Sequence, residues 1–464
     1  MHNPEDYDLV VLGSGEAGKY LAWTLTKQDR RVAVIERRYV GGSCPNIACL
    51  PSKNVIHAAK VASYFRRGAE FGIAAGRWSV DMAAVRERKR KMVDELVAVH
   101  LAQFAASGAE LVRGDGRFVG PKTIEVTIDG GGTRILRGAN VIINTGSRAT
   151  VDSTPGLKES RPLTHVEALE LDRVPDRLVI LGGGYVGLEF AQAFRRLGAR
   201  VTVVERNAAL LHREDEDVSE AMAQLFQDEG IEVFTDTVVG RVMGLSGESV
   251  QLHARQAGAN IVIEGSHLLV AAGRTPNTSG IGLEAAGAAL DSRGHLKVNE
   301  RLQTTAEGVW AAGDCAGSPQ FTHIAFDDFR VILDNLAGVD RMTTGRLVPS
   351  CLFTDPELAR VGLGERDARL QGIPYRLVKI PMAAVLRTRT LSETRGFLKA
   401  LIERDGDRIL GFTAFGAEAG EVMAVVQVAM AAGLPYTMLR DAVLTHPTIA
   451  EGLVVLFSAA LVGV

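Results

Sequence analysis

Leu9-Val-Val-Leu-Gly13-Ser-Gly15-Glu-Ala-Gly18 is an apolar run followed by three spaced glycines, and it decides the fold because it recurs as Leu178-Val-Ile-Leu-Gly182-Gly-Gly184-Tyr-Val-Gly187. In both copies an acidic residue, Glu36 or Glu205, stands 18 residues after the third glycine, and corresponding positions lie 169 residues apart. Each copy therefore predicts a buried strand, a glycine turn, a helix and a second strand that ends in an acid.

The spacing of these glycines is typical of a loop that holds a dinucleotide. The first glycine makes a tight turn, the second lets a pyrophosphate approach the backbone, and the third lets the helix pack on the strand. The helix N-terminus attracts the phosphates, and the acid accepts hydrogen bonds from ribose hydroxyls. A single copy is a weak signal, and glycine turns without a ligand are the alternative interpretation. Two copies, each with its acid, predict two bound dinucleotides.

The composition is that of an ordinary globular protein. The 464 residues are 46% hydrophobic and 23% charged, and the net charge is −3, so a nucleic-acid partner is not expected. Residues 1–7 lack the apolar segment of a signal peptide, and no apolar run reaches the roughly 20 residues that span a bilayer. We expect a cytoplasmic protein with no membrane partner, whose apolar end, Leu453–Val464, is buried or lies at a subunit interface.

Two cysteines, Cys44 and Cys49, lie five residues apart in Gly41-Gly-Ser-Cys-Pro-Asn-Ile-Ala-Cys-Leu-Pro-Ser-Lys53. On a regular helix their Cα atoms would be about 8–9 Å apart, whereas a disulfide needs roughly 4.4–6.8 Å. Pro45 favours a distorted turn that brings the two closer, and a helix N-terminus favours the thiolate. The pair is a candidate redox dithiol. Two inert cysteines are the alternative, and a zinc site lacks a second ligand pair, so we expect no bound metal.

The rest of the chain gives a coarse plan. A helical pattern covers residues 81–106. An antiparallel hairpin is expected from Val119–Ile128 and Thr133–Leu136, followed by a separate strand at Asn140–Asn144. From Leu347 onward, alternating strands and amphipathic helices predict a separate α+β domain. The two remaining cysteines, Cys315 and Cys351, are expected to be small buried residues.

Taken together, the motifs resemble the class I pyridine nucleotide–disulfide oxidoreductases, a family that includes dihydrolipoamide dehydrogenase, glutathione reductase and mercuric reductase. The resemblance spans nearly the whole chain. Its motifs are the two glycine fingerprints, the cysteine block, Thr145-Gly-Ser147, Gly273-Arg-Thr-Pro-Asn277, Thr304…Ala312-Gly-Asp314 and His446-Pro-Thr-Ile-Ala-Glu451.

The resemblance implies a fold class and a domain plan. The class is α/β, with two Rossmann-like dinucleotide-binding domains and a C-terminal α+β dimerisation domain. The expected FAD-binding domain is 1–149 and the NAD(P)-binding domain 150–272. A central segment, 273–345, completes the FAD site, and 346–464 forms the interface of a homodimer.

The family also implies roles for matching residues. Cys49 would be the thiolate that faces the flavin and Cys44 the thiol that exchanges with the acceptor. Lys53 would lie near flavin N5, paired with Glu189. His446, oriented by Glu451, would be the acid/base group, donated by the other subunit so that the two subunits share each active site.

Cofactor contacts are expected along both fingerprints and at the segments after them. FAD would be held by the first loop and Glu36, with Asp314 at its ribityl–phosphate part, and Tyr185 would lie over the flavin where nicotinamide enters. The full set of expected cofactor residues is Gly13, Gly15, Gly18, Glu36, Gly42, Ser43, Lys53, Gly116, Thr145, Gly146, Ser147, Asp314, Gly182, Gly184, Tyr185, Gly187, Glu205, Arg206, Gly273 and Arg274.

The second nucleotide is expected to be NAD. The carboxylate of Glu205 would repel a 2′-phosphate, and Gly187 as the third glycine indicates the same preference. Arg206 is a counterweight, because an arginine can accept that phosphate. NADP therefore stays possible.

The acceptor is expected to be a small molecule, a disulfide or a metal ion. Mercuric reductases typically carry a C-terminal cysteine pair, and this chain has no cysteine after Cys351. Pro45 and Ala48 depart from the usual lipoamide signature, and Phe321–Arg330 is similar to the bacterial branch described as mercuric-reductase-like. The favoured function is an FAD-dependent NAD(P)H oxidoreductase of that kind. The alternatives are a dihydrolipoamide dehydrogenase and a redox sensor or electron-transfer partner of a carrier protein.

Overall fold

The computed structural model describes residues 3–74 and 76–459. Its first sheet carries five parallel strands in the order β3-β2-β1-β5-β15, and β4 joins the far ends of β3 and β5 as an antiparallel strand. These strands are β1 (Glu5–Leu12), β2 (Val32–Glu36), β3 (Glu110–Gly120), β4 (Thr123–Ile128), β5 (Thr133–Ile143) and β15 (Val309–Ala311). The centre of β1 is buried on both faces, as parallel sheets covered by helices require.

This first sheet corrects two predicted boundaries. The strand expected at 119–128 is divided, because Pro121 and Lys122 form the turn between β3 and β4. The separate strand expected at 140–144 is the second half of β5, which continues from the hairpin into the parallel sheet. β5 therefore belongs both to the hairpin and to the parallel sheet, because its first residues pair with β4 and its later residues pair with β1.

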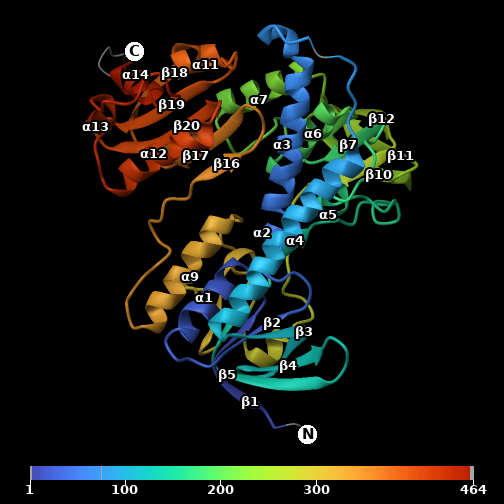
Figure 1. The fold of residues 1–464 in the computed structure, drawn as a ribbon, viewed down its shortest axis with the longest axis vertical. Helices are drawn as coiled ribbons and strands as arrows, with labels where there is room; N and C mark the ends of the chain where they lie inside the picture. The colour runs from blue at the N-terminus through green and yellow to red at the C-terminus, as the bar shows by residue number, and fades with distance from the viewer. Residues whose placement is uncertain (1–2, 75, 460–464) are drawn as a thin grey trace.

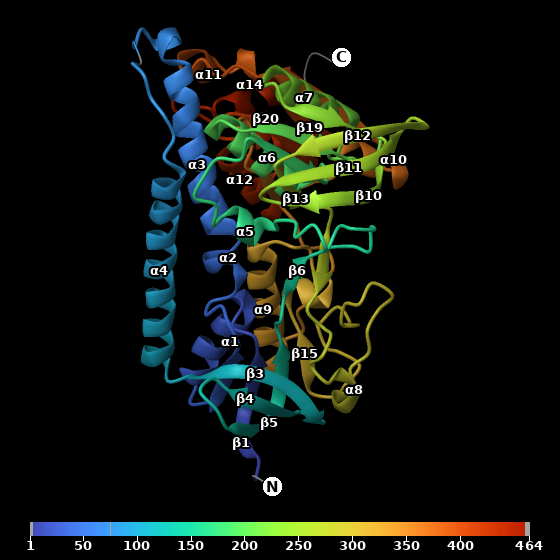
Figure 2. The same cartoon turned by 90° about the vertical axis from the view of Figure 1, so that its right-hand side faces the viewer.

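Helices cover the sheet and connect it to the rest of the molecule (Figures 1 and 2). α1 packs beside α9, and the long α3 and α4 run together from the first domain toward the opposite end of the molecule. The helices of this part are α1 (Glu16–Thr26), α2 (Ser43–Asn46), α3 (Cys49–Arg66), η1 (Gly68–Phe71), α4 (Met82–Ser107), α8 (Leu283–Ala286), η2 (Gly313–Ala316) and α9 (Thr322–Leu336).

The second nucleotide fold lies above the first in these views. Its parallel sheet has the order β13-β7-β8-β9, flanked by an antiparallel sheet β10-β11-β12, and a two-stranded ribbon, β6 with β14, connects it to the first domain. The strands are β6 (Ser147–Ala149), β7 (Arg177–Leu181), β8 (Arg200–Val204), β9 (Glu232–Phe234), β10 (Thr237–Leu245), β11 (Ser249–Gln256), β12 (Ala259–Gly265), β13 (His267–Val270) and β14 (Arg274–Pro276). Its helices are α5 (His165–Ala168), α6 (Tyr185–Leu197) and α7 (Glu216–Asp228).

The C-terminal part is an antiparallel sheet with helices, in the order β16-β17-β20-β19-β18. Its strands are β16 (Ser350–Leu352), β17 (Glu357–Gly362), β18 (Tyr375–Pro381), β19 (Phe397–Glu403) and β20 (Ile409–Gly416). Its helices are α10 (Glu365–Leu370), η3 (Met382–Ala384), α11 (Leu386–Thr390), α12 (Ala419–Ala431), α13 (Tyr436–Arg440) and α14 (Gly452–Ala459). The predicted fold class is therefore confirmed.

The apolar C-terminal run behaves as expected where it is described. Leu453, Leu456 and Phe457 of α14 are fully buried, and the rest of that run, residues 460–464, lies outside the described residues. Among the described helices, none has both the length and the apolar character needed to cross a bilayer.

A buried ion cluster joins the second nucleotide fold to the C-terminal sheet. Lys399 on β19 is 0% exposed, and its Nζ lies 2.8 Å from Asp215, 2.7 Å from Asp217 and 3.0 Å from Glu365. The carboxylate of Asp215 also accepts the backbone N–H groups of Glu365 and Arg366 at the start of α10. Asp215 of the second nucleotide fold thus binds the first N–H groups of α10, and Asp215 and Asp217 pair with the charge of Lys399 in the C-terminal sheet.

Candidate active site

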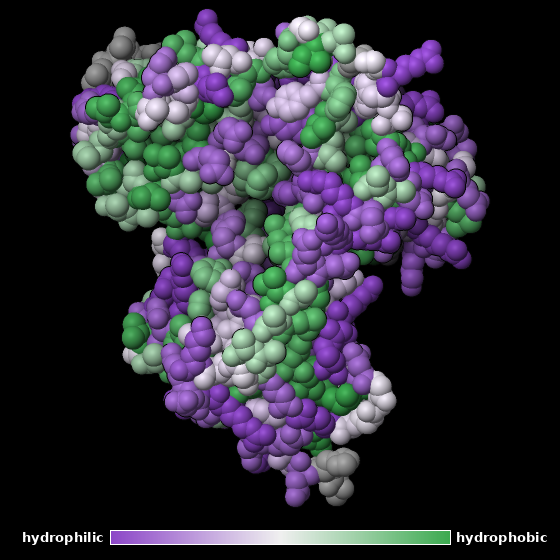
Figure 3. All heavy atoms as spheres, in the orientation of Figure 1, coloured by the Kyte–Doolittle hydropathy of each residue, from purple (hydrophilic) through white to green (hydrophobic). Residues whose placement is uncertain are grey.

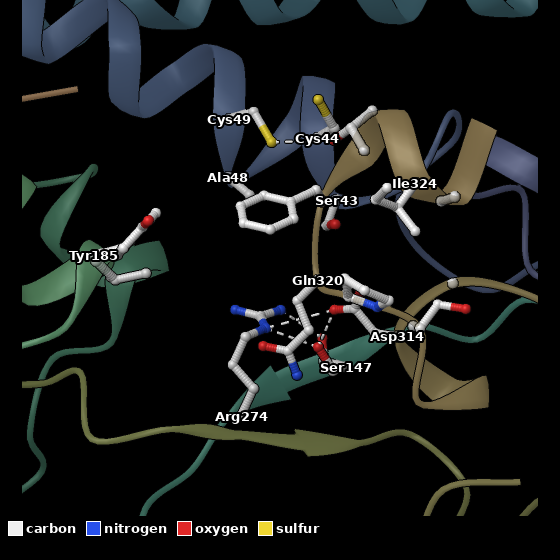
Figure 4. A pocket seen from close by; sticks show the side chains of 18 of the residues that line it. Ser43, Cys44, Ala48, Cys49, Ser147, Tyr185, Arg274, Asp314, Gln320 and Ile324 are labelled. Atoms are coloured by element: carbon white, nitrogen blue, oxygen red, sulfur yellow. Dashed lines mark hydrogen bonds and ion pairs between the residues drawn. The ribbon is translucent and has the colours of Figure 1, made fainter. Parts of the chain in front are cut away.

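One continuous cleft of about 3540 Å³ contains both glycine loops and the cysteine block. Its walls come from the first sheet, the second nucleotide fold and the C-terminal sheet. Figure 4 shows the part of the cleft where Cys49, Tyr185 and Asp314 line a common cavity.

The first glycine loop is fixed by a residue that sequence reasoning missed. Asn144, directly after β5, accepts the N–H of Gly18 at 3.0 Å and donates to the carbonyl of Ala312 at 2.9 Å. A Cβ on Gly13, whose φ is +100°, would lie 2.4 Å from the Asn144 carbonyl oxygen, so only glycine fits there. Asn144 could have been noticed in the motif Asn-Thr-Gly-Ser, because a polar side chain at the end of a buried strand needs a hydrogen-bond partner.

The residues present fit a dinucleotide at each loop. α1 and α6 begin after glycines that supply no side-chain cap, so their first backbone N–H groups stay available for phosphates. A Cβ on Gly184 would meet nothing within 4 Å, which leaves room beside the second loop. Thr145 also lines the cleft, between Asn144 and Gly146.

Glu36 and Glu205 lie at the carboxyl ends of their second strands, beside the glycine loops, and brace them. Glu36 accepts the N–H of Ser14 at 2.9 Å, and Glu205 accepts that of Gly183 at 2.6 Å. Glu205 is only 6% exposed, and its other oxygen accepts the N–H of Asn207 at 2.8 Å. Arg206, the next residue, is exposed at the edge of the cleft.

The two cysteines are brought together by a break between two helices. Cys44 belongs to α2, Ile47 and Ala48 leave the helical conformation, and Cys49 is the first residue of α3. The regular-helix separation considered from the sequence therefore does not apply. The distortion expected at Cys44 from Pro45 lies instead at Ile47 and Ala48, because Cys44 and Pro45 are both inside α2. Both thiols are free in this structure, and the Sγ of Cys49 lies 3.3 Å from the hydroxyl of Thr322.

The two thiols differ in acidity. The pKa of Cys49 is lowered to about 6, chiefly because the Cys44 thiol donates a hydrogen bond to it, with help from Thr322 and the charge of Lys53, against the opposing effect of burial. The same hydrogen bond, together with burial, raises the pKa of Cys44. At neutral pH Cys49 is thus the thiolate of the pair and Cys44 the thiol.

Lys53 and Glu189 form an ion pair at the floor of the cleft. Lys53 Nζ lies 2.7 Å from Glu189 Oε2, and its charge lies 4.7 Å from the ring centroid of Phe353. The other oxygen of Glu189 accepts the backbone N–H of Phe353 at 2.9 Å. Phe353 thus connects this pair to the C-terminal sheet, a role that the sequence alone did not indicate.

Three polar side chains meet on the side of the cavity that faces the two cysteines: Ser147, Arg274 and Asp314 (Figure 4). Arg274 Nε donates to the Ser147 hydroxyl at 2.7 Å and lies 3.6 Å from an Asp314 oxygen, while Ser147 donates to Asp314. Three distant segments of the chain therefore meet around one carboxylate. Five other expected cofactor residues line the same cleft: Gly42, Ser43, Gly116, Gly146 and Gly273.

Tyr185 lines the cleft as the first residue of α6, directly after the second glycine loop. Its hydroxyl lies 3.3 Å from Glu214 and 3.3 Å from Ser350, residues of two different domains. Burial, and next the charge of Glu214, raise the pKa of Tyr185, so the hydroxyl stays protonated.

His446 and Glu451 are paired with each other but lie apart from the cysteines of their own chain. His446 Nδ1 lies 2.9 Å from a Glu451 oxygen, and the imidazole side chain is 60% exposed. Neither residue is among those that line the cleft of this chain. The exposed imidazole is available to another molecule, and it lies outside the cleft that contains Cys44 of its own chain.

One functional candidate had no sequence signal. His165 is 7% exposed, lines the cleft, and its Nε2 has no hydrogen-bond partner among the described residues. Burial and then the charge of Arg274 lower its pKa to about 4, so the imidazole is neutral. Of the other cysteines, Cys315 is fully buried as expected, whereas Cys351 lines the cleft and is only partly buried.

Comparison with known proteins gives consistent relatives over nearly the whole chain. Residues 7–328 match the family model described as pyridine nucleotide-disulphide oxidoreductase, and residues 348–456 match its dimerisation domain. The probable pyridine nucleotide-disulfide oxidoreductase RclA of Escherichia coli (strain K12) is 35% identical over 463 residues, covering 97% of this chain and 99% of that protein.

One further relative and one solved structure are also similar to this chain. The mercuric reductase of Staphylococcus aureus is 33% identical over 450 residues, covering 97% of this chain and 81% of that protein. The solved structure of the Cu(II) complex of the HOCl-induced flavoprotein disulfide reductase RclA from Escherichia coli has a TM-score of 0.89 at 35% identity, covering 98% of this chain and 99% of that one.

Proposed function

Because the chain belongs to the pyridine nucleotide-disulphide oxidoreductase family, we propose that it takes electrons from NADH and delivers them through Cys44 and Cys49 to a disulfide or a metal ion. The observation that carries this proposal is the pair of free cysteines, Cys44 and Cys49, at the break between α2 and α3, inside the cleft that contains both glycine loops. The chain is a flavoprotein oxidoreductase by family, and the acceptor and the choice of NADH are the proposed parts.

The proposal assigns work to the chain's own residues. Bound FAD supplies the acceptance of a hydride and the transfer of its electron pair to the cysteines. Cys49 holds the thiolate, Lys53 is held in place by its ion pair with Glu189, and Asp314 with Ser147 and Arg274 positions the cofactor. Cys44 is the thiol that meets the acceptor.

The electron balance fits either acceptor. NADH, one proton and a disulfide give NAD⁺ and two thiols, whereas NADH and two Cu(II) ions give NAD⁺, one proton and two Cu(I) ions. A metal ion is a reasonable acceptor because the relative RclA forms a Cu(II) complex and another relative is a mercuric reductase. Soft thiolate ligands also favour Cu(I), the product of that reduction, over Cu(II).

We further propose that the protein works as a homodimer in which the partner subunit's His446 serves Cys44. The dimerisation-domain match and the exposed position of His446 support this arrangement. Apolar residues gather over the C-terminal part of the surface in Figure 3, and Val425, Val428, Met438 and Val443 are exposed.

We propose the same domain plan as the sequence indicated. Residues 1–149 bind FAD, 150–272 bind the nicotinamide nucleotide, 273–345 complete the FAD site and 346–464 form the interface.

An acceptor panel tests the function. The purified protein should absorb near 450 nm and contain one FAD per chain, and NADH should reduce it rapidly. Steady-state turnover is then measured with lipoamide, glutathione disulfide, Hg(II), Cu(II) and a quinone. Fast turnover on a disulfide or a metal ion supports the proposal. Rapid reduction by NADH with slow turnover on every acceptor would instead favour the electron-transfer partner of a carrier protein.

Glu205 is expected to set nucleotide choice. Its carboxylate beside a 2′-phosphate would cost on the order of 1–4 kcal/mol at ~4 Å, depending on the local dielectric. Glu205→Gln should therefore raise kcat/KM for NADPH relative to NADH by about tenfold or more. Arg206→Gln is the matched control, and it should lower NADPH use. A ratio that Glu205→Gln leaves unchanged would show that Arg206 dominates recognition.

A further inference from the structure

Asp328 is a buried carboxylate that the proposed reaction does not use. It lies in the middle of α9, is 0% exposed, and is not among the residues that line the cleft. An aspartate is seldom buried so completely unless hydrogen bonds and an opposite charge surround it. The partners of this side chain therefore indicate its role.

One oxygen of Asp328 binds both sides of the turn that carries Asp314. The Oδ2 atom accepts the backbone N–H of Gly313 at 2.8 Å and the hydroxyl of Ser318 at 2.7 Å. Gly313 begins the short helix η2 with a φ of +70°, and Asp314 is the next residue. The carboxylate thus fixes the backbone directly before Asp314 and the side chain two residues after η2.

The other oxygen of Asp328 pairs with a cation from the connector between α9 and the C-terminal sheet. Arg346 Nη1 lies 2.7 Å from Asp328 Oδ1, and its side chain is 16% exposed. The same connector contacts the start of α9 as well, because His323 Nε2 lies 2.9 Å from the carbonyl oxygen of Pro349. Asp328 therefore lies between the turn around η2 and the segment that leads into β16.

Only an ionised carboxylate satisfies all three partners of this position. Gly313, Ser318 and Arg346 each offer a donor, and both oxygens of a carboxylate accept hydrogen bonds. An asparagine of the same shape has one oxygen and one NH₂ group, so its NH₂ group would face either the turn or the guanidinium. Asp328→Asn therefore breaks one side of the cluster without opening a cavity.

The turn that Asp328 holds contributes an expected cofactor residue to the cleft wall. There the carboxylate of Asp314 accepts the Ser147 hydroxyl and lies 3.6 Å from Arg274 (Figure 4). A side chain that binds one particular group of a cofactor has to be held to within about 0.5 Å by the residues behind it. Asp328 is such a residue, because it binds the backbone one position before Asp314.

We propose that Asp328 is a positioning residue that holds Asp314 in place for FAD, with Arg346 as its counter-ion. The inference rests on the proposed function, because it takes Asp314 as a contact of bound FAD. It goes beyond that function by assigning the retention of FAD to a residue outside the cleft and to the connector of the C-terminal sheet.

The proposal predicts faster loss of FAD. When a turn adopts its binding position only part of the time, the apparent dissociation constant rises by the inverse of that fraction. Losing a hydrogen bond to a charged group should weaken FAD binding by about tenfold to hundredfold, mostly through faster release. Asp328→Asn should show this effect. Ser318→Ala removes one of the two donors from the turn, so it should show a smaller effect in the same direction.

The experiment uses the FAD-loaded protein. Each holoenzyme is diluted, and the rise in flavin fluorescence gives the rate at which FAD leaves. The long-wavelength band after two-electron reduction, recorded with added FAD, is the second readout, because it reports how the flavin lies relative to the Cys49 thiolate. Asp334→Asn is the matched control, since Asp334 is a carboxylate of the same helix that pairs with Arg341 at 3.3 Å and does not line the cleft.

The outcomes are distinct. Faster FAD release and a shifted band in Asp328→Asn, with a smaller change in Ser318→Ala and none in Asp334→Asn, support the positioning role. Release at the wild-type rate in Asp328→Asn, or equal acceleration in the control, overturns it. Faster release with an unshifted band also overturns it, because FAD would then be lost through a general loosening of the fold.

Two further points keep the test decisive. If wild-type protein binds no FAD, the proposed function itself has failed, and that result is recognised before any variant is compared. Ser318→Ala removes a single oxygen, so it decides the question by the same two readouts if Asp328→Asn does not fold.

Discussion

Cys44→Ser should show a long-wavelength absorbance band without any reductant, and it should lose turnover with every disulfide acceptor. The substitution leaves Cys49 with no sulfur to bridge, so its thiolate stays beside the oxidised flavin that it is proposed to face. Because the pKa of Cys49 is lowered to about 6, the band should grow as pH rises through about 6 and persist to pH 9. Absorbance spectra across pH 5–9 measure it.

Two further variants serve as controls for this result. Cys49→Ser should lack the band at every pH, because no thiolate remains next to the flavin. Cys44→Ala should show the band only at higher pH than Cys44→Ser, since alanine removes the hydrogen bond that contributes most to the lowered pKa of Cys49. A serine hydroxyl can still donate that bond. A Cys44→Ser protein without the band from pH 6 to 9 would reverse the assignment of the two cysteines.

His446→Ala should leave flavin reduction by NADH nearly intact and slow turnover on a disulfide acceptor by about 10²–10⁴-fold. Glu451 accepts from Nδ1, which leaves Nε2 free to take the proton of Cys44 and return one to the departing thiol. A metal ion needs no thiol leaving group, so turnover with Cu(II) should fall far less. Stopped-flow reduction and steady-state turnover separate the two halves of the cycle.

Mixed dimers test whether His446 acts between subunits. A heterodimer of one Cys44→Ser chain and one His446→Ala chain contains one site with both wild-type halves, so part of the disulfide turnover should return. The parent homodimers are the controls, because neither has an intact site. Continued inactivity in a preparation shown to contain heterodimers would place the histidine's action within its own chain or remove it from the reaction.

The sequence predicted the fold class because its signals are local and repeated. The two glycine loops, their strands and their acids lie within short segments, so periodicity and spacing were enough. Strand boundaries were less certain, because β5 pairs with β4 at one end and with β1 at the other, and only the tertiary arrangement shows that these are one strand. A distorted turn near the cysteines was expected from Pro45, but Pro45 lies inside α2 and the break falls at Ile47 and Ala48, two residues with no helix-breaking signal.

What the sequence could not give are contacts between distant segments. Asn144 and Gly18, which form a hydrogen bond, are 126 residues apart in the sequence, and Phe353 and Glu189, which form another, are 164 apart. No rule of motif spacing predicts either contact. His165 belongs to no motif, and its place in the cleft wall follows only from the folded structure. The expected roles of the site residues stay predictions, because geometry places the side chains but does not observe a reaction.

The buried ammonium of Lys399 limits how this protein can be recombined with its relatives. Its three carboxylate partners come from two domains, so a chimera with a C-terminal domain that lacks Lys399 would leave Asp215 without its ammonium partner and Asp217 with only Lys379. Removing one member of a buried charge group typically costs about 3–5 kcal/mol. An exchange of C-terminal domains between relatives should therefore keep Lys399 together with Asp215, Asp217 and Glu365.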